Sequence, residues 1–137
     1  VFSEVSYHAS YQPMRAVRTE KYKYIKLFYD VSIPCYPNID DSPSKSILTS
    51  NPGFRQINQD EMLFDLECDP LESQNLAGNP QYKDVLNEMR AKLKNWMKDT
   101  SDPLLNGKKI PKPHGAVVNT MDSLSAEDTE YEQQDQD

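Results

Sequence analysis

One segment constrains the fold of this chain more than any other, because residues 80–100 predict a long amphipathic helix. Large apolar side chains recur there at steps of three and four residues, at Tyr82, Val85, Leu86, Met89, Leu93, Trp96 and Met97. Asn79 can accept a hydrogen bond from a free amide of the first turn, and Pro80 fits the first helical position. Each of these apolar side chains contributes about 1.5–3 kcal/mol when fully buried, so another element must cover this face.

Two further segments predict the strands that cover the helix. Residues 14–29 are rich in β-branched and aromatic residues and are divided by a polar turn at residues 19–21, which predicts a hairpin. In its second strand Ile25 and Leu27 share one face, which is expected to point toward the core. Residues 61–66 alternate in polarity and predict a third strand. The sequence therefore predicts an α+β fold, a small antiparallel sheet packed on one long C-terminal amphipathic helix.

The rest of the chain predicts a long loop and a tail. Residues 30–60 hold four prolines among scattered Asn, Asp and Ser residues, which favours a long packed loop or insertion near a site. Residues 104–137 show no apolar period and end in an acidic stretch rich in Ser, Glu and Gln. Such a composition buries too little apolar surface to offset the entropy of ordering, so this tail is expected to be extended and largely disordered. The predicted domain covers residues 1–103.

The charge is distributed unevenly along the chain. It has 15 Lys and Arg residues against 22 Asp and Glu residues, a formal net charge of −7, which argues against generic nucleic-acid binding. Residues 122–137 hold seven acids and no Lys or Arg. Residues 1–29 hold five Lys and Arg residues against two Glu residues, a local excess of 5 − 2 = +3. An anionic ligand would find complementary charge in that N-terminal stretch.

Membrane insertion and export leave no signal in this sequence. No apolar run approaches the roughly 20 residues that span a bilayer. The chain begins at Val1 without a charged region followed by an apolar one, so no signal peptide is visible. We interpret the chain as a piece of a longer protein, with no membrane partner expected.

The sequence predicts no catalytic residue and no metal ligand within this chain. His8 and His114 are its two histidines, and no His, Cys and Asp cluster has metal-ligand spacing. The acids of the ECDPLE stretch (residues 67–72) lack the Gly and the distal Glu of a calcium loop, which favours a turn role. Cys35 and Cys68 can either pair as a disulfide or remain two unpaired thiols.

Two stretches of the chain resemble the C-terminal subdomain of the sulfatases. MRAVRTEKYKYIKLF is similar to the family's strand pattern R.VRT.KYKYI. FDLECDPLESQNLAGNPQYKDVLNEMRAKLKNWMKDTSDP is similar to the family's strand and turn LYDL..DP.E..NLA..P.Y, followed by a helix that ends before T.DP. The resemblance covers residues 4–103, with the pieces in the family's order. It implies an alkaline-phosphatase-like parent fold, with an N-terminal catalytic domain of the same chain as partner.

Within the sulfatases, two segments resemble the heparan N-sulfatases, or sulfamidases. These are the opening EVSYHASYQPMRAVRT and the insertion IPCYPNIDDSPSKSIL. The resemblance implies hydrolysis of the sulfamate of N-sulfoglucosamine in heparan-type glycans by an exported parent, in a lysosome, a periplasm or outside the cell. An arylsulfatase-like enzyme for O-sulfate esters is an alternative, because it shares the strand and helix motifs. A non-catalytic module that binds anionic glycans is a further alternative.

The family's nucleophile is a formylglycine made from the Cys or Ser of a C/S-x-P-x-R motif beside a bound Ca²⁺. Cys35-Tyr36-Pro37 and Cys68-Asp69-Pro70 both begin C-x-P, but the fifth residue is Ile39 in one and Glu72 in the other. Both also follow the C-terminal strand motif, which the family's nucleophile precedes. The resemblance therefore implies that formylglycine and Ca²⁺ belong to the full-length parent, and that this fragment binds neither and is inactive alone.

The resemblance implies substrate-binding roles for Glu4, His8 and Arg15, which are expected just before the first strand and within reach of the sugar. Arg offers a planar fork of donors that matches sulfate or carboxylate oxygens. A Glu can accept hydrogen bonds from sugar hydroxyls, and a His can donate to an anionic group. Structural roles remain open as well, since Arg15 can pair with Asp65 or Glu20.

Overall fold

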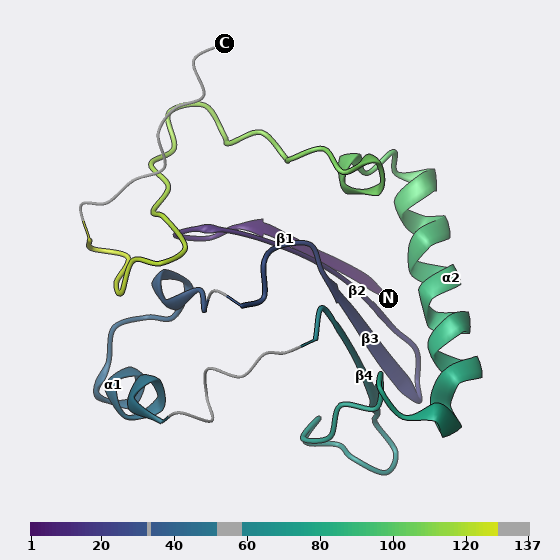
Figure 1. Ribbon diagram of the computed structural model, residues 1–137. Helices are drawn as coiled ribbons and strands as arrows, with labels where there is room; N and C mark the ends of the chain where they lie inside the picture. Colours follow the sequence, from purple (N-terminus) through teal and green to yellow (C-terminus); the bar gives the residue numbers. More distant parts are fainter. Residues whose placement is uncertain (33, 52–58, 129–137) are drawn as a thin grey trace.

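The computed structural model describes residues 1–32, 34–51 and 59–128 of the chain. Its four-stranded sheet has the order β1-β2-β3-β4, with every neighbouring pair antiparallel. The strands are β1 (Phe2–Tyr7), β2 (Tyr11–Arg18), β3 (Tyr22–Leu27) and β4 (Glu61–Asp65). The helices are η1 (Tyr36–Asn38), α1 (Pro43–Ser50), η3 (Pro80–Tyr82), α2 (Lys83–Asp99) and η4 (Pro103–Asn106). Helix α2 lies along the sheet, which confirms the predicted α+β fold (Figure 1).

The long helix begins where the sequence predicts. The Asn79 side chain accepts a hydrogen bond from the backbone amide of Gln81 at 3.0 Å, and the first turn, η3, is a 3₁₀ helix that leads into α2. Thr100 closes the other end through its backbone amide. The buried stripe of α2 consists of Leu86, Met89, Leu93 and Met97. Because a local apolar period needs no information from elsewhere in the chain, the sequence predicts this element closely.

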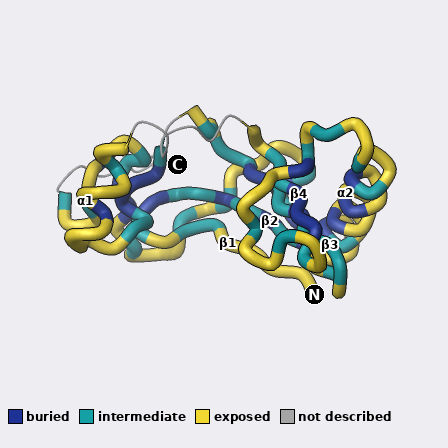
Figure 2. Tube along the Cα trace, turned by 90° about the horizontal axis from the view of Figure 1, so that it is seen from below, coloured by how far each residue is buried: buried dark blue, intermediate teal, exposed yellow. Residues whose placement is uncertain are grey.

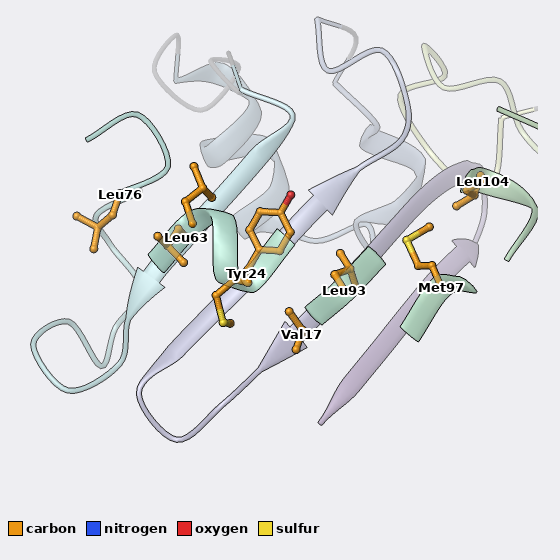
Figure 3. Close-up of a cluster of buried hydrophobic side chains, with 9 residues drawn as sticks. Val17, Tyr24, Leu63, Leu76, Leu93, Met97 and Leu104 are labelled. Carbon is orange, nitrogen blue, oxygen red and sulfur yellow. The ribbon is translucent and has the colours of Figure 1, made fainter. Parts of the chain in front are cut away.

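The core lies between α2 and one face of the sheet. Val17, Tyr24 and Leu63 are direct cross-strand neighbours and are all buried. Figure 3 shows these side chains gathered with Leu93 and Met97 of the helix.

Phe2 of β1 extends this cross-strand row, since it lies opposite Val17. Its ring stacks on that of Trp96, with centroids 5.2 Å apart and planes 4° apart. Helix α2 therefore contacts the sheet as far as its β1 edge.

The prediction for the second strand of the hairpin is only partly correct. Leu27 is buried, but Ile25 is half-buried and shares with Leu27 the face turned away from α2. The residue that enters the core beneath α2 is Tyr24, 2% exposed. Its ring can be buried because its hydroxyl donates to Glu61 Oε1 at 2.5 Å. The alternation of polarity placed Tyr24 on the outward face of this strand. The face predicted to pack against the helix was therefore the wrong one.

Strand β1 is an element that the sequence analysis does not predict. It pairs with β2, with Glu4 opposite Arg15 and Val5 opposite Met14. Glu4 therefore lies within a strand that the sequence does not predict, and Arg15 lies within β2, whose span overlaps the predicted hairpin. Residues 2–5 are all exposed at this edge of the sheet, so they show no buried face that alternation could reveal.

The described part of the segment 30–60 contains a short helix. Helix α1 begins at a Ser42 cap, whose hydroxyl accepts from the Lys45 amide at 3.2 Å, and Pro43 occupies its first turn. Cys35 and Tyr36, just before it, are buried. The predicted loop is therefore packed at Cys35 and Tyr36, whereas most of α1 is exposed. Positions 33 and 52–58 of the loop lie outside the described part of the chain.

Residues 104–128 differ from the predicted disordered tail. Asn119 is buried and forms an isolated parallel bridge with Ser10, which lies in the turn between β1 and β2. Its side-chain amide donates to the carbonyls of Ser125, Ala126 and Asp128 at 3.1–3.3 Å. A buried polar side chain thus organises a segment with little apolar surface, which a composition argument does not detect. Residues 129–137 lie outside the described residues, and a domain boundary at residue 103 stays a prediction.

The molecule is extended, with α1 and α2 at opposite ends of the molecule. Helix α1 and the C-terminal segment gather at one end, and α2 lies at the other (Figure 2). Among the described residues, no helix combines the length and apolar character that a bilayer crossing requires.

Candidate functional site

Arg15, one of the three predicted substrate-binding residues, is buried at 2% exposure. Its Nε donates to Asp102 Oδ2 at 2.6 Å, and its Nη1 donates to the carbonyls of Val5 at 2.9 Å and Met14 at 2.8 Å. Asp102 is also buried, and its Oδ1 accepts from the Leu104 amide at 3.0 Å. The ion pair therefore joins β2 to the chain just beyond α2, which is a structural use of the guanidinium.

Arg15 pairs with Asp102 and not with Asp65 or Glu20, the two structural partners that the sequence suggests. Asp65 instead accepts hydrogen bonds from the amides of Glu67 and Cys68, in the turn that follows β4. Asp102 lies 87 residues from Arg15 in sequence, so no local pattern connects the two. A substrate-binding role for Arg15 stays a prediction.

Glu4 and His8 lie at different points of β1 and its turn. The Glu4 carboxylate approaches Arg15 Nε at 3.5 Å and its side chain is 62% exposed. His8 is exposed in the turn between β1 and β2, and within the described chain its imidazole has no hydrogen-bond partner. The structure thus brings Glu4 and Arg15 together and leaves His8 apart from them.

Glu4 and Arg15 begin a row of charged residues that crosses the whole sheet. In the strand register, Glu4 lies opposite Arg15, Arg15 opposite Lys26, and Lys26 opposite Glu61. Burial raises the pKa of Glu61, but the hydrogen bonds from Arg90 and Tyr24 outweigh it, so that the pKa is lowered overall. This end of the row stabilises the fold and leaves little charge for a ligand.

The positive excess of the N-terminal stretch is largely neutralised by acids that the fold brings to it. Lys21 pairs with Glu67 at 2.8 Å, and Lys23 pairs with Glu72 at 2.6 Å. Lys26 pairs with Asp60 in the same way. Because these lysines already have anionic partners, the geometry gives little support to a module that binds anionic glycans through residues 1–29.

The two cysteines are both free thiols in the structure, so the disulfide alternative is not adopted. Cys35 is buried, and burial raises the pKa of its thiol, which disfavours the thiolate. Cys68 is exposed. The residue four positions after Cys68 is Glu72, which is engaged with Lys23. Neither stretch fits a formylglycine site.

The described residues also do not fit a calcium site. No group of three or more His, Cys, Asp or Glu side chains comes together within residues 1–32, 34–51 and 59–128. Asp69 accepts from the Ser73 hydroxyl at 2.9 Å and the Gln74 amide at 2.8 Å. These contacts give Asp69 the turn role that the sequence predicts, whereas Glu67 and Glu72 pair with lysines.

A pocket between α1 and the C-terminal segment is a feature that sequence reasoning missed. Its cavity volume is about 440 Å³. Its walls include Tyr36, Asp41, Lys45, Ser50, Leu124 and Ser125. The run of hydroxyl residues in α1 is the only local signal for it, because the opposite wall lies more than 70 residues away in sequence.

Comparison with known proteins identifies relatives of this region. The family described as the C-terminal region of aryl-sulfatase matches residues 3–120. Two ulvan-active sulfatases of Formosa agariphila are 32% identical over 93 residues and 31% identical over 102 residues. The matches cover 67% and 65% of this chain but 18% and 17% of those relatives. The chain thus spans less than a fifth of the length of these curated relatives.

Two solved structures share the fold. A 2-O GAG sulfatase is similar with a TM-score of 0.53 and 26% identity, covering 82% of this chain and 19% of that one. A candidate sulfatase from Bacteroides thetaiotaomicron VPI-5482 gives a TM-score of 0.54 at 23% identity, over 92% of this chain and 22% of that one, and supports the fold alone.

These comparisons bear out the sulfatase resemblance but not its narrower branch. The relatives are named for activity on ulvan and for 2-O GAG sulfate, and none of those reported above is named as a heparan N-sulfatase. The match over residues 3–120 covers most of the chain and includes the strands, α2 and part of the C-terminal segment. The chain belongs to the family of C-terminal regions of aryl-sulfatases.

Proposed function

We propose that this chain is the C-terminal region of a sulfatase that hydrolyses O-sulfate esters of a sulfated polysaccharide. The observation that carries the proposal is the family match over residues 3–120, together with relatives named as ulvan-active and 2-O GAG sulfatases. In this proposal an N-terminal catalytic domain of the same chain breaks the ester bond. The region described here supplies packing and part of the surface that meets the glycan, with Glu4, His8 and Arg15 as the residues that the resemblance implies.

The sheet face turned away from α2 supports packing against that catalytic domain. Val5 is 42% exposed there, and Ile25 and Met62 are half-buried. Exposed apolar surface of this kind favours contact with another protein surface over contact with water. We expect the catalytic domain to cover this face.

The chemistry of the parent follows from the same proposal. Formylglycine and Ca²⁺ would belong to the catalytic domain, because neither C-x-P stretch here has the Arg that the family's motif requires. An exported parent, in a lysosome, a periplasm or outside the cell, is part of the proposal by family resemblance.

Hydrolysis of the sulfamate of N-sulfoglucosamine is the second candidate, and one structural observation favours it. The two segments that resemble the sulfamidases, the opening and the insertion, contact each other. The Ser10 amide donates to Asn38 Oδ1 at 2.8 Å, and Asn38 Nδ2 donates to Gln12 Oε1 at 3.0 Å. These hydrogen bonds hold the two segments side by side.

The test is sulfate release by the full-length parent. Two disaccharides of the same sugars serve as substrates, one carrying only a 2-O-sulfate and the other only an N-sulfate. Free sulfate is measured by ion chromatography, with a parent lacking the nucleophile of its C/S-x-P-x-R motif as the blank. We expect release from the O-sulfated sugar. Release from the N-sulfated sugar alone supports the second candidate, and release from neither, on these or on longer sulfated glycans, contradicts both.

A further inference from the structure

We propose that the basic segment, residues 107–114, binds the sulfate and carboxylate groups of the polysaccharide. The proposal rests on the proposed function, since it names the groups of that substrate which this chain recognises. Between Asp102 and Asp122 the sequence holds no acid, and its basic residues there are Lys108, Lys109, Lys112 and His114. In a chain with a formal net charge of −7, this stretch is a local excess of positive charge, which attracts anionic groups.

Two lysines of the basic segment have no acidic partner within the described residues. Lys108 is exposed and Lys112 is half-buried, and neither forms an ion pair there. The nearest acid that precedes them, Asp102, is buried and already pairs with Arg15. By contrast, the lysines of residues 21–26 all pair with acids. The charge of Lys108 and Lys112 thus remains available to a ligand.

Two tyrosines of the sheet hold the basic segment on its way from η4 to the C-terminal segment (Figure 1). The Tyr7 hydroxyl donates to the Ile110 carbonyl at 2.7 Å, and the Ile110 amide donates to the Tyr11 hydroxyl at 3.1 Å. The Lys109 ammonium lies over the Tyr11 ring, 5.0 Å from its centroid. Both backbone polar groups of Ile110 therefore have partners on the sheet, which fixes the segment at its middle.

Prolines restrict the backbone on both sides of Lys112. Pro111 precedes it and Pro113 follows it. A proline ring holds its own φ near about −65°, and the residue before a proline is confined largely to extended conformations. A segment that is already restricted loses less conformational entropy when it binds a ligand.

The basic segment also lies against the turn between β1 and β2, which carries His8. Tyr7, on one side of His8, bonds the segment directly. On the other side, the Ala9 carbonyl accepts from the amide of Asn119, a few residues beyond the segment, at 2.9 Å. His8 is exposed between these two contacts. A glycan that reaches His8, as the resemblance implies, would therefore meet the basic segment as well.

The residue type favours a glycan over a protein surface. Lysine is a compact charge with three rotatable donors, so it can follow sulfate groups at different positions on a sugar. Lysine is also depleted in interfaces between proteins. An acidic surface of the catalytic domain is the alternative partner, and the experiment distinguishes it.

The experiment uses the full-length parent with the nucleophile of its C/S-x-P-x-R motif replaced, so that bound glycans stay intact. Sulfated oligosaccharides of ulvan and of heparan sulfate are titrated by calorimetry. We expect the parent to bind at least one of them, and Lys108→Gln/Lys112→Gln to weaken its dissociation constant about three- to tenfold, the loss of two exposed charge contacts. Lys94→Gln/Lys98→Gln is the matched control, because it removes two exposed charges from α2, and it should change the constant little.

Three further measurements show whether the effect is due to charge. Lys108→Arg/Lys112→Arg keeps both charges and should retain the affinity of the parent. At about 1 M salt, where the Debye length is about 3 Å, the difference between the parent and the Gln variant should disappear. The melting temperature without glycan should be unchanged in the Gln variant, because neither lysine has an acidic partner within the described residues.

Each outcome separates this proposal from the proposed function. If the active parent releases sulfate but its glycan binding is absent, is unchanged by Lys108→Gln/Lys112→Gln, or falls equally in the α2 control, the basic-segment proposal is wrong and the sulfatase proposal stands. If binding depends on these lysines but the active parent releases no sulfate, the reverse holds. Unchanged affinity with a lowered melting temperature also overturns the proposal, because the lysines would then contact the catalytic domain.

Discussion

Arg15 and Asp102 form a buried ion pair between residues 87 positions apart in the sequence. A buried charge that loses its partner is strongly destabilising, because its desolvation is no longer compensated. The resemblance to sulfatases implies substrate binding by the same arginine. The two roles lead to different results when the side chain is removed in the absence of substrate.

We expect Arg15→Ala to lower the local stability of the sheet by about 3–5 kcal/mol, because it leaves Asp102 buried and unpaired. Hydrogen exchange of the β2 amides in the full-length parent, without substrate, measures this change. Asp102→Ala should have a similar effect, and the double variant should lose less than the sum of the two. Glu4→Ala is the control, with a loss below about 1 kcal/mol, because that partner is exposed.

The contrary result is equally specific. Unchanged exchange together with a large fall in kcat/KM after Arg15→Ala would show that the guanidinium serves the substrate rather than the fold.

Glu61 predicts a dependence of stability on pH. Its folded pKa is lowered, since its hydrogen bonds from Arg90 and Tyr24 outweigh burial, which acts in the opposite direction. A lowered folded pKa contributes stability above the unfolded value, about 4.3 for Glu, and this stability is lost as pH falls through the folded value.

Below about pH 4.3, the ordinary pKa of Glu, the free energy of unfolding of the parent should fall as the pH falls. We expect Glu61→Gln to make this fall smaller. Thermal unfolding of both proteins between neutral and acidic pH measures it. The control is Glu88→Gln, whose carboxylate is exposed and pairs only with Lys92 within α2. Parallel pH curves for the parent and Glu61→Gln would rule out this contribution.

At the scale of elements, α2 supplies more side chains to the core cluster than any other element does. Met89 is 1% exposed and belongs to the cluster that Val17 and Leu63 complete from the sheet. We expect Met89→Ala to destabilise this region by about 2–5 kcal/mol through the lost contacts and the cavity. Urea unfolding monitored by Trp96 fluorescence measures the change. Glu88→Ala, on the exposed face, should shift stability by less than about 0.5 kcal/mol, and equal effects of the two would contradict the assigned face.

The elements differ in how well the sequence predicts them, for a physical reason. Helix α2, together with the Asn79-capped η3 turn that leads into it, is encoded by residues close together in sequence, so the local pattern predicts it. Strand β1 is not predicted, because its residues 2–5 are exposed and its position depends on pairing with β2. Tyr24 was assigned to the wrong face because its burial depends on Glu61, a residue of another strand.

The candidate site is less predictable than the fold. The partner of Arg15 and the two walls of the pocket come from distant parts of the chain, and Asp41 and Ser125 are 84 residues apart. A single sequence shows which residue types are present but does not show which ones the fold brings together.

At the scale of the whole molecule, the sheet face that carries Val5, Ile25 and Met62 predicts low stability for the isolated chain. This face retains exposed apolar surface, which the parent should bury. We expect the purified 137-residue chain to melt broadly and at a lower temperature than the parent, and its β3 amides to exchange faster. A sharp cooperative transition of the isolated chain, with β3 protected as in the parent, would show that the face needs no cover.

The most direct test of the account is sulfate release by the full-length parent from O-sulfated oligosaccharides of ulvan or glycosaminoglycan type, with free sulfate measured by ion chromatography. The account predicts release of sulfate from an O-sulfated sugar that depends on a nucleophile outside this chain. A parent that binds these glycans without releasing sulfate from either an O-sulfated or an N-sulfated sugar would contradict it.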